Sequence, residues 1–432
     1  MTLYDFLLPL GAAAAAPAYL LRSLRHPEYR HHLGERLGRL PRDLTDRLDA
    51  LPRRPVWIQA VSVGEVGLAR ALIRALARET TLQERPLPLV LSTTTPAGRD
   101  TAAAIREPGL VGSFYFPIDW KPFVRRTLRG VKPSALVCVE TELWPGTLTQ
   151  CRQRGVPVVL INGRISETSG RRYLRLGGML RGPLEAVRLA CMQSEDDARR
   201  LRAIGVPADR VVVTGNMKFD AAPLMPEGLE AGRRAYGIPD SVSRVLVAGS
   251  TSAGEEEMLL DAVALAGLQQ TLVILAPRHR ERFDEVAALL RRRGLSFARR
   301  SELPEVAHRQ VLLLDTIGEL ARAYALASVA GVAFVGGSLV PRGGQNLIEP
   351  AACGVPVLFG PHTASFAAVA DSLIQAGAGF RVDGVEGLAA ELRRLFQDGA
   401  SRRAAGRAGR NLIEAHRGAT DRTVHQILPF LG

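Results

Sequence analysis

Short, mostly apolar runs recur along this sequence from about residue 55 onward, and segments of helical period separate them. The first series lies at residues 56–63, 88–95, 135–141, 156–163, 189–194 and 210–215. Because these runs lack the polar alternation of a strand with one face in water, they predict buried strands of a parallel sheet with helices on both faces. A helix is predicted for 65–79, where Leu68, Leu72 and Leu76 share one face. The pattern is that of an α/β fold.

A second series of such runs predicts a second domain. It lies at residues 244–251, 271–278, 311–315, 332–338 and 356–361. The chain has 432 residues, more than one hydrophobic core usually serves. We therefore predict two Rossmann-like parallel-sheet domains facing a deep cleft, with ligands at the C-terminal ends of the strands. The predicted segments are an N-terminal membrane-associated helix with its basic flank (1–40), a first α/β domain (41–222), a linker (223–240), a second α/β domain (241–415) and a C-terminal helix that can cross back to the first domain (416–432).

The N-terminus combines an apolar stretch with a basic flank. Residues 3–21 have about the length needed to span a bilayer, but Asp5, Pro9 and Pro17 dilute their apolar character. Five arginines follow within residues 22–39, and positive charge on that side would keep the rest of the protein on the cytoplasmic face. We expect a membrane anchor or an interfacial helix here, with an ordinary buried helix as the alternative.

The charge balance limits the possible partners. Lys and Arg number 56 against 43 Asp and Glu, which gives a formal net charge of +13. This surplus favours polyanions, namely nucleic acid, anionic lipid headgroups or phosphorylated substrates. Aromatic residues are only 5% of the chain and no basic run is interleaved with them, so nucleic acid is disfavoured. A basic protein that only binds a membrane surface remains the non-enzymatic alternative.

Motifs at three predicted strand ends of the first series carry candidate catalytic side chains. SVGE ends on Glu65 in the first turn of a predicted helix, where a carboxylate either complements the helix dipole or serves as a general base. ETELWPG holds Glu140 and Glu142 two residues apart. TGNMKFD holds Lys218, which is either a surface cation or a charge that meets a departing phosphate.

A glycine-rich run in the second series is the strongest signal for nucleotide binding. The stretch 336–356 places Gly343, Gly344, Asn346 and Glu349 on loops or at a helix start. Backbone amides of such a loop can approach a nucleotide, and a nearby carboxylate can bind ribose hydroxyls.

Other turns of the second series also suit an anionic ligand. APRH ends a predicted strand with Arg278, and arginine binds phosphate or carboxylate in a bidentate manner. DTIGEL places Gly318 and Glu319 on a loop. The turn at 248–257 could offer free amides to a phosphate, although its own glutamates already complement that helix start.

Several common chemistries find no motif here. The sequence has neither a GxGxxG fingerprint after the first strand nor a GxxxxGK[ST] loop, and its eight histidines show no metal-ligand spacing. Hydride transfer, ATP hydrolysis and metal catalysis are therefore disfavoured. We expect neither a cofactor nor a metal.

The motifs, taken in order, resemble the Kdo transferases of lipopolysaccharide biosynthesis (glycosyltransferase family 30). The shared strings are SVGE, STTTPAG, ETELWPG, INGRIS, QSEDDARR, VTGNMKFD, APRHRERF, DTIGEL, FVGGSLVPRGGQNLIEPAA and FGPHT, spread over residues 62–363. The resemblance implies a GT-B fold with an acceptor-binding first domain and a second domain for the CMP-sugar. It implies an inverting enzyme of the Gram-negative inner membrane, acting at its cytoplasmic face. Its partners would be CMP-Kdo, a phosphorylated lipid A precursor (lipid IVA) and the anionic membrane surface, without nucleic acid.

The resemblance also implies roles for single residues. Glu65 matches the family's proton acceptor, and Glu140 and Lys218 match residues that support the transition state. The matches to CMP contacts are Pro277, Arg278, Ile317, Gly318, Glu319, Gly343, Gly344, Gln345 and Asn346. Glu349 as a ribose ligand is our extrapolation. Gln345 stands where the family often has His, which argues against an imidazole role at this position.

Two other enzyme classes remain open. Sugar-nucleotide epimerases share the two-domain architecture and also use carboxylates in the cleft, and another GT-B lipid glycosyltransferase would show similar motifs. An epimerase acts on the nucleotide sugar alone, whereas a transferase needs an acceptor as well.

Overall fold

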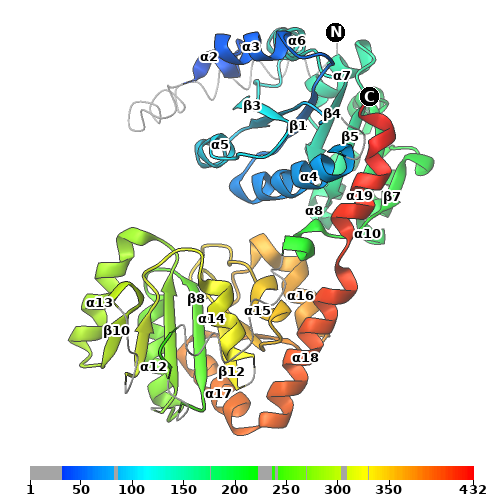
Figure 1. The fold of residues 1–432 in the computed structure, drawn as a ribbon. Coiled ribbons are helices and arrows are strands. Elements are labelled where there is room, and N and C mark those ends of the chain that lie inside the picture. Colours follow the sequence, from blue (N-terminus) through cyan, green and yellow to red (C-terminus); the bar gives the residue numbers. More distant parts are fainter. Residues whose placement is uncertain are drawn as a thin grey trace. The chain divides into compact units, whose positions relative to one another are not determined.

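The computed structural model describes residues 32–81, 86–175, 177–221, 236–238, 242–268, 270–302, 309–328 and 330–432. Contacts divide the chain into two compact units (Figure 1): the first ends at Asp220 and also includes Gly418–Gly432, and the second is Ala221–Arg417. Each unit contains one seven-stranded parallel sheet, which confirms the predicted α/β class. The predicted anchor segment before residue 32 and most of the predicted linker lie outside the described residues.

The first unit has the strand order β3-β2-β1-β4-β5-β6-β7. Its strands are β1 (Val56–Gln59), β2 (Leu89–Thr93), β3 (Leu110–Tyr115), β4 (Ala135–Val139), β5 (Val158–Gly163), β6 (Val187–Met192) and β7 (Val211–Val213). Its helices are α2 (Leu33–Arg36), α3 (Arg42–Asp49), α4 (Val63–Thr81), α5 (Pro96–Ala103), α6 (Lys121–Val131), α7 (Pro145–Gln153), α8 (Glu167–Arg175), α9 (Gly177–Leu184), α10 (Glu195–Ile204) and α19 (Ala419–Ile427).

Two hydrophobic cores cover the two faces of this sheet because successive side chains of a strand point to opposite faces. Trp57 of β1 belongs to one core, with Val124 of α6 and Leu148 of α7. Ile58, the next residue, belongs to the other core, which also holds Leu72 of α4. Both β1 side chains are fully buried. The continuous apolar runs of the sequence follow from this burial on both faces.

The second unit has the strand order β10-β11-β9-β8-β12-β13-β14. Its strands are β8 (Val245–Thr251), β9 (Leu272–Pro277), β10 (Phe297–Arg299), β11 (Val311–Leu313), β12 (Gly331–Val335), β13 (Val357–Phe359) and β14 (Gly379–Arg381). Its helices are α12 (Glu255–Leu265), α13 (Phe283–Arg292), α14 (Leu320–Ala327), α15 (Ile348–Ala352), α16 (Ala367–Gln375), α17 (Gly384–Gln397) and α18 (Gly399–His416). Leu246 and Val247 of β8 again enter separate cores.

Three strands, β3, β10 and β14, were not anticipated by the sequence pattern. Each lies at an edge of its sheet. The side chains of β10 are all half-buried, and β14 has one buried, one half-buried and one exposed residue. An edge strand pairs on one side only and is partly exposed, so it lacks the continuous apolar run used as the signal.

The last helix, α19, belongs to the first unit. The Asp220 carboxylate accepts hydrogen bonds from the backbone N–H groups of Gly418 (2.6 Å) and Thr420 (2.6 Å), at the positive end of the helix. Val424 of α19 packs in the same core as Leu72 of α4. Among the helices of the described ranges, none is both long and apolar enough to cross a bilayer.

Candidate functional site

Glu65 lies in the first turn of α4, immediately after the C-terminal end of β1. Its carboxylate accepts hydrogen bonds from the Val61 N–H (2.8 Å) and the Ser62 hydroxyl (3.0 Å). The residue is only 8% exposed. Burial raises the pKa of Glu65; the charge of Glu140 adds to the shift, while the hydrogen bonds and the charge of Lys218 oppose it. The carboxylate therefore combines a fixed orientation with an increased affinity for a proton.

Glu140 and Lys218 form an ion pair at the same end of this sheet. Glu140 directly follows β4, and its Oε1 lies 3.0 Å from Nζ of Lys218. Its backbone N–H donates to the carbonyl of Ile161 in β5 (2.8 Å). Because the charges of both residues act on Glu65, the structure brings together all three catalytic residues suggested by the sequence.

The backbone around this pair adopts uncommon conformations. Glu140 (φ 59°) and Asn162 (φ 52°) are both in the left-handed region, which costs about 1 kcal/mol or more for a residue other than glycine. Asn162 is fully buried, and its Oδ1 accepts a hydrogen bond from the N–H of Met217 (2.9 Å), next to Lys218. Such strained residues cluster at functional sites, where the surrounding structure holds them in place.

Glu142 adds a third carboxylate to this group. Burial raises the pKa of Glu142 to about 7, and the negative charges of Glu65 and Glu140 contribute to the shift. The ETELWPG motif pairs Glu142 with Glu140 in the sequence, but nothing there indicates a role for Glu142. With a pKa of about 7, Glu142 is partly protonated at neutral pH.

Asp119 fixes the segment that follows these carboxylates. Its side chain accepts hydrogen bonds from the N–H groups of Gly146 (2.8 Å) and Thr147 (2.6 Å) and from the Thr147 hydroxyl (2.6 Å). The first residues of α7 therefore have a buried acceptor for their free N–H groups. No local sequence pattern indicates Asp119, because the residues that it contacts are distant in the chain.

Arg278 follows Pro277, the last residue of β9 in the second unit. Its backbone N–H donates to the carbonyl of Thr251 (3.0 Å), whereas its exposed guanidinium forms no hydrogen bond or ion pair with the described part of the chain. Burial raises the pKa of Glu349, and a hydrogen bond from Asn346 (3.0 Å) and the charge of Arg278 oppose that shift. Arg278, Asn346 and Glu349 thus lie close to one another, as a nucleotide site requires.

The glycine-rich loop follows β12 and has the conformation that its glycines allow. Gly343 (φ 86°) and Gly344 (φ 77°) are both in the left-handed region. A Cβ atom at Gly343 would lie 2.9 Å from the Ser365 hydroxyl, so a larger residue would displace that hydroxyl and would also strain the backbone. The N–H of Gly344 donates to the carbonyl of Gly337 (2.7 Å), and that of Gln345 to Gly336 (3.1 Å).

The loop with Ile317, Gly318 and Glu319 has a different arrangement. Ile317 is 58% exposed and Gly318 has a φ of 92°. Glu319 accepts hydrogen bonds from Arg300 (2.8 and 3.2 Å) and the Thr316 hydroxyl (2.9 Å). Burial alone would raise the pKa of Glu319, but these contacts hold it below its usual value. Within the described ranges, no hydrogen bond or ion pair joins this loop to Arg278 or to the glycine-rich loop.

The turn after β8, expected to offer free amides to a phosphate, is filled by its own glutamate. Oε1 of Glu255 accepts from the N–H groups of Ser338 (2.9 Å) and Leu339 (2.9 Å), and Oε2 from Gly337 (2.6 Å) and Ser252 (2.8 Å). Glu255 is fully buried. It therefore supports the glycine-rich segment and leaves these four amides unavailable to a ligand. In the part of the chain that the structure describes, no group of three His, Cys, Asp or Glu side chains could hold a metal ion.

Known proteins similar to this chain agree in one family. The model for 3-deoxy-D-manno-octulosonic-acid transferase (kdotransferase) matches residues 31–221. A 3-deoxy-D-manno-octulosonic acid transferase of Bordetella pertussis is 38% identical over 391 residues, which cover 88% of this chain and 88% of that protein. One from Haemophilus influenzae is 32% identical over 420 residues, which cover 95% of this chain and 94% of that protein.

Solved structures with low sequence identity show the fold. A glycosyltransferase of Rickettsia africae has a TM-score of 0.55 at 13% identity, covering 88% of this chain and 98% of its own. The UDP-GlcNAc 2-epimerase of Neisseria meningitidis has a TM-score of 0.54 at 14% identity, covering 87% of this chain and 100% of its own. Both likenesses establish a GT-B fold and do not distinguish transfer from epimerisation.

Proposed function

This chain belongs to the Kdo transferase family of lipopolysaccharide biosynthesis, and on that premise we propose that it transfers Kdo from CMP-Kdo to the lipid A precursor lipid IVA, with inversion at the anomeric carbon. The observation that carries this proposal is the buried Glu65 carboxylate beside the Glu140–Lys218 ion pair. An inverting transfer needs one base on the acceptor side, and Glu65 meets the requirements for that role.

In the proposed reaction, Glu65 is the general base. The acceptor hydroxyl attacks the anomeric carbon of Kdo, its proton passes to the Glu65 carboxylate, and the bond from that carbon to the phosphate oxygen breaks to release CMP. A carboxylate with a raised pKa is a stronger base than an ordinary one, provided that it remains ionised at the working pH. The hydrogen bonds from Val61 and Ser62 would keep it oriented. By analogy with glycosidases, the transition state has oxocarbenium character.

The second unit would hold the CMP part of the donor. The guanidinium of Arg278, which has no partner among the described residues, and the amide of Gly343 are suited to one phosphate, and Glu349 to the ribose hydroxyls. Pro277, Gln345, Asn346 and the 317–319 loop would complete the nucleotide site. Lys218, oriented by Glu140, would offset negative charge that develops on the leaving CMP. These cationic and amide groups can meet a single phosphate, so the proposal requires neither a metal nor a cofactor.

We also propose that the protein works at the cytoplasmic face of the inner membrane. Its net charge of +13 suits a phosphorylated lipid acceptor among anionic headgroups. The apolar stretch of residues 3–21, followed by arginines, would hold the enzyme there. Washing membranes with high salt and then with detergent tests this: an anchored protein is released only by detergent.

Epimerisation is the competing function, since the fold is shared with an epimerase. The relatives at 32–38% identity are transferases, and they favour transfer. The test is to incubate the protein with CMP-Kdo, with and without a tetra-acylated acceptor, and to analyse the products by mass spectrometry. We expect the acceptor to gain whole Kdo units only when both substrates are present. Isomerisation of the nucleotide sugar without acceptor, or an unchanged acceptor, would contradict the proposal.

A further inference from the structure

Arg164 is the first residue after β5, and its backbone is tied to the turn that carries the site carboxylates. The Thr141 hydroxyl donates to the carbonyl of Arg164 (2.5 Å) and accepts from the N–H of Arg164 (2.8 Å). Thr141 lies between Glu140 and Glu142. These reciprocal hydrogen bonds fix the position of Arg164 relative to the carboxylates.

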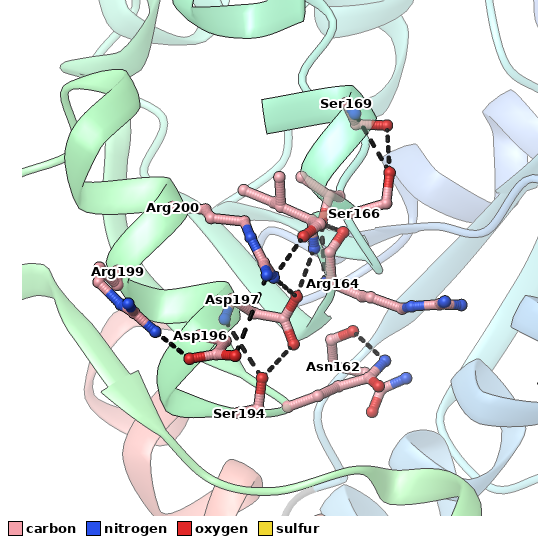
Figure 2. Close-up of polar contacts among 12 residues, drawn as sticks. Asn162, Arg164, Ser166, Ser169, Ser194, Asp196, Asp197, Arg199 and Arg200 are labelled. Atoms are coloured by element: carbon pink, nitrogen blue, oxygen red, sulfur yellow. Dashed lines mark hydrogen bonds and ion pairs between the residues drawn. The ribbon is translucent and has the colours of Figure 1, made fainter. Parts of the chain in front are cut away.

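A second set of contacts holds the same loop from the other side (Figure 2). Oδ1 of Asp197 accepts from the N–H of Ile165 (2.8 Å), and Arg200 donates to the carbonyl of Ile165 (3.0 Å). The Ser194 hydroxyl in turn donates to Asp197 (2.5 Å). The backbone of two successive residues thus makes four hydrogen bonds to side chains, so the loop is fixed from both sides.

The side chain of Arg164 does not take part in this network. Figure 2 shows its guanidinium directed away from Asp197 and Arg200, and it makes no hydrogen bond or ion pair with the described residues. The nearby Arg199 and Arg200, in contrast, both lie within ion-pair distance of Asp196. A half-buried arginine on a fixed backbone offers a planar set of N–H donors, and this planar group loses less entropy per hydrogen bond formed than a lysine ammonium does.

The charges around the site explain why such a donor is needed. Glu65, Glu140 and Glu142 would repel an anionic substrate, and Lys218 is already paired with Glu140. Both substrates of the proposed reaction are anionic near the reacting atoms. A further cation beside this turn would offset the repulsion, and the Arg164 guanidinium, whose backbone is bonded to Thr141, has no partner among the described residues.

We infer that Arg164 is a substrate-binding residue that receives an oxyanion, either a phosphate of the lipid acceptor or the carboxylate of the Kdo being transferred. This inference rests on the proposed function and deepens it. An oxyanion accepts two parallel hydrogen bonds from a guanidinium, and this geometry distinguishes arginine from lysine. Arg164→Gln should therefore weaken binding of this ligand most. Arg164→Lys should bind it with an affinity between those of Arg164→Gln and the wild type.

Equilibrium binding tests the inference without requiring turnover. The full-length protein in detergent micelles is titrated by calorimetry with the tetra-acylated bisphosphorylated acceptor, the same acceptor lacking one phosphate, CMP-Kdo and CMP. Arg188→Gln is the matched control, because it removes one exposed arginine from within β6. Thermal unfolding verifies that each variant is folded.

We expect Arg164→Gln to weaken one ligand by roughly tenfold or more, the effect of one charge-assisted hydrogen bond. Loss of affinity for the bisphosphorylated acceptor alone identifies a phosphate, and the acceptor lacking that phosphate should then bind both proteins equally. Loss of affinity for CMP-Kdo, with CMP unchanged, identifies the sugar carboxylate. Unchanged affinities for both substrates, as in Arg188→Gln, would overturn the inference. Failure of the proposed function appears separately, as wild-type protein that binds but transfers no Kdo.

Discussion

Three neighbouring glutamates of the first unit, Glu65, Glu140 and Glu142, have one ion pair among them within the described ranges, whereas three glutamates of the second unit each have a full set of partners. Burial and neighbouring carboxylates raise the pKa of Glu65 and of Glu142, and Lys218 pairs with Glu140. Two carboxylates of the group therefore have an increased affinity for a proton.

In the second unit, Glu255 is surrounded by four N–H groups, Glu256 pairs with Arg282, and Glu319 pairs with Arg300. Hydrogen bonds and ion pairs of this kind offset the cost of burying a carboxylate and fix its position. A buried carboxylate with too few partners has a perturbed pKa, which suits acid–base chemistry but lowers stability. The difference separates glutamates with a proposed catalytic role from glutamates that support the fold. The following predictions test that assignment.

The largest effect is expected on stability, from Glu256→Ala. Glu256 is fully buried and bonded to Arg282 (2.6 and 3.1 Å) and to the Thr251 hydroxyl (2.6 Å). Removing one partner of a buried pair leaves an uncompensated charge and costs about 3–5 kcal/mol. Urea unfolding measures this loss, with the neighbouring Glu257→Ala as control. Equal, small losses of unfolding free energy in both variants would contradict the structural role assigned to Glu256.

Glu65→Gln should lower turnover by roughly a hundredfold or more, the contribution typical of a general base. The amide keeps the size of the side chain but cannot take the proton, so CMP affinity should be unchanged. Steady-state transfer assays and calorimetry with CMP separate the two effects. Glu167→Gln, at another helix start, is the matched control and should keep full activity. Near-normal turnover in Glu65→Gln would remove the assigned role.

Glu142 predicts a pH dependence of stability. Its pKa in the folded protein is about 7, above the ordinary glutamate value of 4.5. The folded state therefore binds this proton more tightly, so the contribution of Glu142 to stability is greatest below about pH 4.5 and is lost as the pH rises through 7. We expect a loss on the order of 2 kcal/mol, allowing for solvent screening.

Urea unfolding of wild type and Glu142→Gln at pH 5 and pH 8 tests this expectation. The loss should disappear in Glu142→Gln, so that the variant gains stability relative to wild type at pH 8. Glu195→Gln, in the first turn of α10, is the control without such an effect. Parallel pH profiles for wild type and Glu142→Gln would show that Glu142 does not hold the proton.

Arg278→Ala should have the smallest of these effects, about a tenfold loss of CMP affinity, because it removes one charged contact to the phosphate. Turnover at saturating CMP-Kdo should change much less. Calorimetry with CMP provides the measurement, and the exposed Arg280→Ala is the matched control. Equal CMP affinity in the two variants would show that Arg278, at the end of β9, does not bind the phosphate.

Much of the fold could be predicted from the sequence, because burial on both faces leaves a direct mark on it. The central strands, such as β1 and β4, appear as mostly apolar runs. Edge strands such as β3 and β14 leave no such mark, since one side of each is unpaired and partly exposed.

The location of the candidate catalytic residues could also be predicted, because Glu140 directly follows a buried strand and Glu65 and Lys218 lie in the first helical turn after a strand. Their catalytic roles stay predictions. Their supporting residues could not be predicted. Asp119, Asp197 and Glu255 act on backbone amides of Gly146, Ile165 and Gly337, which are far away in the chain. A lone acidic residue carries no local sign of such a contact.

The central claim is that Glu65 takes the proton of the acceptor, and the pH dependence of single-turnover transfer tests it most directly. A base must be deprotonated, so the wild-type rate should fall as the pH drops through a pKa above the ordinary glutamate value, which burial of Glu65 predicts. The residual rate of Glu65→Gln should lack this acidic limb. If Glu65→Gln keeps the same acidic limb, the proton goes to another group and the account is wrong.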